Sequence, residues 1–224
     1  MKPAKCFAHL KLEPEYRNIN ELVTISDRLH MCETLFGDLN AKVMVLGQDG
    51  AHFGNMQALV AAECARGYRH GENVRTNINL IECLSKYTRK RVDGSIDPKE
   101  CGVFYANAVW LLKGGDGMAA RLPRLMSVLR ECAPVMKATI EGLPKLELII
   151  AMGRVAYRSL RLADNRLNGN WQNLVENKTV CDANLFGKAV KVAAVLHPGP
   201  LAGGQNVPQL RANFEHILET AGLL

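Results

Sequence analysis

The residue types best suited to chemistry in this sequence are an aspartate, an asparagine and a histidine that each follow an apolar run. Asp49 lies in Gly47-Gln48-Asp49-Gly50-Ala51-His52, Asn107 follows Phe104-Tyr105-Ala106, and His197 opens His197-Pro198-Gly199-Pro200. A carboxylate, an amide and an imidazole placed together could carry out acid–base chemistry on a hydrogen-bonded substrate. Each also has a simpler explanation, because Asp49 could cap a helix and the other two could occupy ordinary turns. Their joint spacing favours the chemical role.

The apolar runs that precede these residues are of strand length and cover residues 42–46, 102–106, 146–152 and 190–196. Because they are continuous rather than alternating, they are typical of parallel strands covered on both faces. Helical spacing separates them, as in Ile78, Ile81 and Leu84, or in Leu122, Leu125, Met126 and Leu129. This alternation predicts an α/β fold, with a leading helix within residues 16–40 and a closing helix over 208–220.

In open α/β sheets ligands bind beyond the carboxyl ends of the strands, so the residues that follow the four runs should share one rim. Gly153 and Arg154 follow the third run and join the three side chains above. We find no internal repeat and no convincing linker, so we expect a single domain over residues 1–224.

Composition narrows the class of protein. The chain has 224 residues, of which 48% are hydrophobic and 22% charged, and its net charge of +6 is compatible with a polyanionic partner. Its seven cysteines are scattered, without a C-x-x-C pair, which argues against a disulfide framework and a zinc ribbon. Since no signal peptide or long apolar segment is evident, we expect a soluble, cytoplasmic protein that makes no membrane contact and is monomeric by default.

Three motifs resemble those of the uracil-DNA glycosylase superfamily, in the same order. Gly47-Gln48-Asp49 with His52 is similar to the water-activating Gly-Gln-Asp-Pro-Tyr-His of the family 1 enzymes. Residues 102–109 resemble the strand that carries the uracil-reading asparagine, and residues 197–201 resemble the His-Pro-Ser-Pro-Leu loop. The resemblance implies a three-layer α/β/α fold around a mainly parallel four-stranded sheet.

The resemblance also implies roles for the site residues. Asp49 would activate the attacking water, His197 would donate to uracil O2, and Asn107 would read the pyrimidine edge and reject cytosine. The remaining residues implied to contact the base are Gln48, Ala51 and Phe53. No metal, iron–sulfur cluster or organic cofactor is expected. Because no lysine nucleophile stands in these motifs, we expect a monofunctional enzyme that leaves an abasic site for base-excision repair.

DNA is the partner that the resemblance implies, with the uracil extruded from the helix. Leu201 stands where the family inserts a leucine, and a place in the core is the less favoured alternative. The residues implied to contact DNA phosphates are Thr76, Gly153, Gly199 and Gly203. Arg154 begins a basic stripe with Arg158 and Arg161 that could contact DNA or simply face solvent.

The chain departs from the family at two positions that affect the base pocket. Ala51 replaces the tyrosine that blocks the 5-methyl group of thymine, so we expect 5-substituted uracils to be accepted. The stacking phenylalanine is missing near residues 59–63, where Phe53 or Tyr68 could substitute, although Phe53 could be plain core.

Two other classes of function stay open. A non-catalytic nucleic-acid-binding relative would explain the missing aromatic. A small-molecule α/β hydrolase is disfavoured, since neither G-x-S-x-G nor G-x-G-x-x-G occurs.

Overall fold

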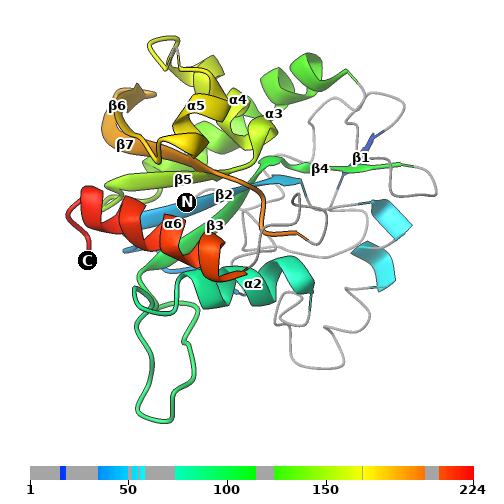
Figure 1. Cartoon of the computed structure of the whole chain (residues 1–224). Helices are drawn as coiled ribbons and strands as arrows, with labels where there is room; N and C mark the ends of the chain where they lie inside the picture. Colours follow the sequence, from blue (N-terminus) through cyan, green and yellow to red (C-terminus); the bar gives the residue numbers. More distant parts are fainter. Residues whose placement is uncertain are drawn as a thin grey trace.

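A five-stranded sheet forms the centre of the computed structural model, which describes residues 16–18, 35–49, 52–54, 56–58, 74–114, 124–167, 169–199 and 207–224. In spatial order the strands are β3 (Val103–Val109), β2 (Val43–Asp49), β5 (Leu148–Met152), β7 (Lys188–Val195) and β6 (Val180–Leu185). The first four are parallel, and β6 runs antiparallel to β7 (Figure 1). A separate pair joins β1 (Tyr16–Asn18) to β4 (Leu111–Lys113).

The four predicted strands are therefore confirmed, but the predicted sheet of four strands is wrong because β6 adds a fifth. Strand β6 pairs with β7 through a tight turn at Phe186 and Gly187, both of which have positive φ angles, of 53° and 86°. Such a turn matches the twist of a hairpin. Strand β6 lies at the edge of the sheet and is partly exposed. Its sequence therefore contains no continuous apolar run from which a strand could be predicted.

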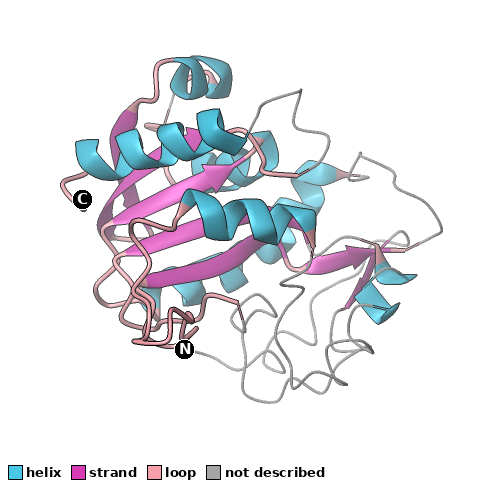
Figure 2. Cartoon of the chain, turned by 60° about the horizontal axis from the view of Figure 1, so that its bottom comes forward, coloured by secondary structure: helices cyan, strands magenta, loops and turns pink. Residues whose placement is uncertain are grey.

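Helices cover both faces of the sheet (Figure 2). One face carries α2 (Arg75–Cys83) and α6 (Val207–Thr220), and the other carries α3 (Leu125–Glu141), α4 (Arg154–Ala163) and α5 (Trp171–Glu176). Alternate residues of the strands enter the two resulting cores, as Val45 joins Leu80 and Phe214 whereas Met44 joins Val128. Sandwiching the sheet in this way explains its continuous apolar strands and is compatible with a three-layer α/β/α fold.

The predicted closing helix is confirmed as α6, whereas the predicted leading helix is wrong where the structure describes it. Residues 16–18 form β1, and residues 35–40 are turns with a bridge from Gly37 to Phe104; residues 19–34 lie outside the described residues. Tertiary pairing with β3 and β4 thus overrides the local apolar spacing.

The helical spacing is confirmed by α2 and α3, although two of its residues lie outside the core while Leu84 and Leu129 are buried. Ile78 of α2 and Met126 of α3 are 40% and 37% exposed. The side chains that α2 buries are Asn77, Asn79, Leu80 and Cys83, so polar residues share its inner face.

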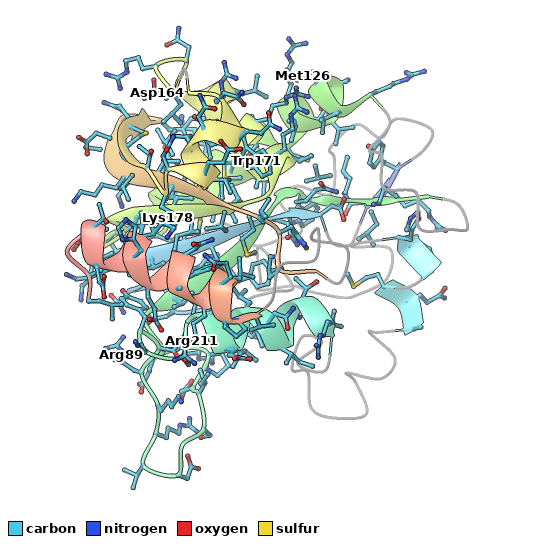
Figure 3. All side chains as sticks on the ribbon, in the orientation of Figure 1. Arg89, Met126, Asp164, Trp171, Lys178 and Arg211 are labelled. Carbon is cyan, nitrogen blue, oxygen red and sulfur yellow. The ribbon has the colours of Figure 1, made fainter. Side chains whose placement is uncertain are left out.

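Asp164, which follows α4 and is labelled in Figure 3, connects the end of this helix to β6. Its carboxylate accepts hydrogen bonds from the Arg166 guanidinium at 2.9 and 3.0 Å and from the backbone N–H of Asn184 on β6 at 2.7 Å. The Arg166 hydrogen bonds, followed by the Asn184 N–H, hold the pKa of Asp164 below its ordinary value.

Of the helices in the described ranges, none is long and apolar enough to cross a membrane.

Candidate active site

Four neighbouring strands bring the predicted site residues to one edge of the sheet. The order β3-β2-β5-β7 places Asn107, Asp49, Gly153 and His197 at successive carboxyl ends. Gly47 pairs with Asn107 across β2 and β3, and the Gly153 N–H donates to the carbonyl of Val195 at 2.9 Å. The prediction that these residues share a rim is confirmed.

Gly47 makes room for the Asn107 side chain. A Cβ at residue 47 would lie 2.5 Å from Asn107 Oδ1 and within 3.1 and 3.2 Å of two atoms of the Tyr105 ring and hydroxyl. Only glycine therefore lets the amide oxygen and the tyrosine pack over β2 as they do. The Asn107 carboxamide consequently has a defined position beside the strand that carries Asp49.

The carboxylate of Asp49 is held between two donors. Gln48 Nε2 donates to Asp49 Oδ2 at 2.9 Å, and Lys113 Nζ lies 3.3 Å from the same oxygen. The side chains of Lys113 and Asp49 are only 9% and 8% exposed. Two donors on one oxygen restrict the orientation of the carboxylate. The motifs contain no lysine, but the fold brings Lys113 to Asp49 from outside them.

The ring of His197 is fixed by the loop that follows it. The N–H of Gly199 donates to His197 Nδ1 at 3.1 Å, so the proton of the neutral imidazole resides on Nε2. Burial lowers the pKa of His197 below its ordinary value, and the charge of Asp49 opposes this shift in part. At neutral pH His197 is therefore an uncharged hydrogen-bond donor close enough to Asp49 to sense its charge.

Helix α2 and the start of α4 hold the His197 loop from two sides. Asn79 Nδ2 of α2 donates to the carbonyl of Pro198 at 2.7 Å. A Cβ on Gly199 would approach Thr76 Oγ1 to 3.3 Å, and one on Gly153 would lie 3.5 Å from His197 Cβ. The structure thus brings Thr76, Gly153 and Gly199 around His197.

His52 lies next to this group. It is 8% exposed and forms a parallel bridge with Lys113, and neither of its ring nitrogens has a hydrogen-bond partner within the described residues. Lys113 is thus linked to Asp49 through its amine and to His52 through the backbone bridge.

Other predicted residues lie farther from this centre or outside the described chain. Arg154 and Arg161 are exposed on α4 and Arg158 is half-buried, so the predicted stripe exists. Phe53 packs against the core, and the guanidinium of Arg17 lies 3.6 Å from its ring centroid, which covers one ring face. The residues of the prediction that lie outside the described ranges are Ala51, Leu201 and Gly203.

Sequence reasoning missed two residues of the site, Lys113 and Asn79. Lys113 follows directly on the apolar segment Val109–Leu112. If that segment is buried, the lysine is buried with it, and a buried lysine requires a partner of opposite charge. Asn79 and Asn77 stand in one helix although asparagine is a poor helix former, which signals a tertiary role.

A separate cavity of about 850 Å³ lies at the opposite, amino end of the strands, lined by Asp38, Lys42, Arg89 and Lys145 among others. Asp38 binds the Arg89 guanidinium and the N–H of Gly102 there, at 2.9 and 2.8 Å. This cavity includes none of the residues that the motifs predicted.

The described residues contain no group of three or more His, Cys, Asp or Glu side chains that could hold a metal ion. Comparison with models of known protein families and with curated proteins gives no match to this chain. The arrangement itself, with a fixed carboxylate, a neutral imidazole donor and a positioned carboxamide, is suited to cleaving a bond whose two halves acquire opposite charges.

Proposed function

We propose that this protein is a DNA glycosylase of the uracil-DNA glycosylase type, which hydrolyses the N-glycosidic bond of uracil in DNA. Breaking that bond develops positive charge on the deoxyribose and negative charge on the departing base. The observation that supports the proposal most directly is that the Asp49 carboxylate and a neutral His197 share the carboxyl edge of the sheet, at the ends of β2 and β7 on either side of β5.

His197 is the group that receives the charge of the departing base. Its Nδ1 is already occupied by the Gly199 N–H, so Nε2–H is the donor that can approach uracil O2. A donor that is neutral in the resting enzyme costs little to desolvate and strengthens its hydrogen bond as O2 becomes anionic. Gly199 leaves room for the ring, because a Cβ there would lie 2.9 Å from His197 Nδ1 and 3.3 Å from its Cε1.

Asp49 acts on the sugar side of the bond. Its negative charge favours the cationic sugar, and the carboxylate would orient the water that attacks C1′. Gln48 holds Oδ2 at 2.9 Å, so the carboxylate needs little rearrangement when substrate binds.

Asn107 gives the site its base preference. A carboxamide can accept from uracil N3–H and donate to O4, whereas cytosine offers the reverse pattern. With Ala51 in place of a blocking tyrosine, we further propose that uracils with a 5-substituent are accepted.

DNA would lie across the carboxyl edge of the sheet. Arg154 at the start of α4 and the backbone of Gly153 and Gly199 face this edge and would contact phosphates. Extrusion of the base, with Leu201 filling the vacated space and Gly203 near the backbone, completes the proposal, which makes this an enzyme that starts base-excision repair.

Excision from labelled oligonucleotides tests the proposal. One uracil is placed in a single strand, opposite G or opposite A, with thymine and 5-substituted uracil oligonucleotides beside it, and alkali converts each abasic site to a strand break. We expect Asp49→Asn and His197→Ala to lose roughly 10²- to 10⁴-fold in single-turnover rate. Asp182→Asn and His216→Ala, which change exposed residues of the same types on β6 and α6, should retain the wild-type rate.

The opposite result would favour the second candidate, a nucleic-acid-binding relative without activity. The Arg17 guanidinium over Phe53 is the observation that favours it, because it removes one face of the nearest candidate for base stacking. No excision from any strand, combined with DNA binding that is lost at high salt, would replace the glycosylase by this function.

A further inference from the structure

The buried ion pair between Lys113 and Asp49 is not explained by base release. A cation 3.3 Å from Asp49 Oδ2 neutralises part of the charge that would stabilise a cationic sugar. The amine is also costly to bury, and its side chain is only 9% exposed. Solvent-exposed lysines such as Lys145 carry no such cost. We therefore expect Lys113 to have a chemical function that is separate from base release.

The position of the amine suggests that role. Under the proposed function Asp49 orients a nucleophile toward C1′ of the deoxyribose, and Lys113 Nζ already lies within contact distance of the same carboxylate. Strand β4, which carries Lys113, is paired with β1 and forms a bridge with His52, so the side chain starts from a supported backbone. A primary amine placed there meets the aldehyde that an abasic deoxyribose exposes when its ring opens.

We propose that Lys113 is the nucleophile of an abasic-site lyase activity, in which its amine forms an imine with C1′ of the abasic deoxyribose and the strand is then cut on the 3′ side. This proposal rests on the proposed function for the placement of DNA. It replaces the expectation of a strictly monofunctional enzyme.

Each step of the reaction balances within the site. The ammonium of Lys113 gives a proton to Asp49, and the freed amine forms an N–C bond to C1′ of the aldehyde. Asp49 returns the proton to the hydroxyl on C1′, which leaves as water and yields the protonated imine. Asp49, again a carboxylate, takes a proton from C2′ and passes it to the phosphate that departs as the C3′–O bond breaks, so that the strand on the 3′ side leaves with this phosphate. Water hydrolyses the imine, which frees Lys113 and leaves an unsaturated aldehyde on the strand.

A pre-formed abasic site separates this activity from base release. An oligonucleotide with a chemically prepared abasic site is incubated with the full chain, with and without sodium borohydride, which reduces the imine to a stable secondary amine. We expect strand cutting without alkali and a covalent protein–DNA adduct, which peptide mass spectrometry places on Lys113. Base release is measured in parallel on the uracil oligonucleotide after alkali.

Two variants at residue 113 keep the test independent of folding. Lys113→Arg retains a cation beside Asp49 but cannot form the imine, and Lys113→Met removes both the charge and the amine. We expect both to lose the adduct, with thermal melting curves reporting that they fold. Lys145→Arg, at the opposite end of the sheet, should form as much adduct as the wild type.

The outcomes distinguish the two proposals. Uracil release without any adduct would overturn the lyase and leave the glycosylase standing, as would an adduct that persists in Lys113→Arg or maps to another residue. An adduct on Lys113 without uracil release would support the lyase and overturn the proposed base specificity.

Discussion

Replacing Gly47 by alanine should separate base recognition from stability. The new Cβ would lie 2.5 Å from Asn107 Oδ1, whereas ordinary contact begins at 3.4 Å, so the amide oxygen must move by about 1 Å. A hydrogen bond of about 2.9 Å does not survive a displacement of that size. The backbone of β2 can stay in place, because the atom that moves is the tip of a side chain.

The size of the effect follows from what the displaced amide would leave unpaired. Losing its hydrogen bonds to the base should cost about 2–3 kcal/mol. This corresponds to a roughly 30- to 160-fold loss of kcat/KM for uracil. The free energy of unfolding should change by less than about 1 kcal/mol, because two effects oppose each other. Alanine stabilises a strand relative to glycine, whereas crowding of Tyr105 by the new Cβ destabilises it.

The assay is excision of uracil by Gly47→Ala, Asn107→Ala and the double variant, beside urea unfolding of each. If both substitutions act on the same contact, the double variant should be no slower than Asn107→Ala alone. Gly54→Ala is the matched control, because nothing lies within 4 Å of its added Cβ. Wild-type excision by Gly47→Ala, or additive losses in the double variant, would refute the assignment of base reading to Asn107.

Three further predictions concern the His197 loop and the DNA-facing edge. Asn79→Ala removes the donor to the Pro198 carbonyl and should lower excision about tenfold, with a stability loss of about 1 kcal/mol, measured by single-turnover kinetics and urea unfolding. Because burial lowers the pKa of His197 from 6.5, the folded protein binds fewer protons than the unfolded chain, so stability is present above pH 6.5 and falls toward the lowered pKa. The acid limb of kcat/KM should likewise lie below pH 6.5, since protonation of Nδ1 breaks its bond from Gly199, and a limb at or above 6.5 would contradict the neutral donor. Arg154→Ala should weaken DNA binding equally for all sequences and reduce the slope of log affinity against log salt by about 1, measured by fluorescence anisotropy.

The local sequence specified the central strands and the order in which the site residues occur. Continuous apolar runs can satisfy their hydrophobic faces only when covered on both sides, so the parallel sheet and its rim could be predicted without coordinates. The edge strand β6 could not, because only two of its six residues are buried and its pairing depends on the turn at Phe186 and Gly187. Residues 16–18, which were expected to begin a helix, form β1 for a related reason, since pairing with β4 determines their conformation.

What the sequence determined by itself is the set of chemical groups near Asp49, Asn107 and His197, because short motifs at strand ends encode residue type and spacing. Only the tertiary structure decided how those groups are held. Lys113 reaches Asp49 across 64 positions of sequence, and Asn79 reaches Pro198 across 119. Contacts between residues so far apart in sequence depend on how the strands pair and how α2 packs against the sheet. No local sequence pattern predicts that the Lys113 amine lies 3.3 Å from the Asp49 carboxylate.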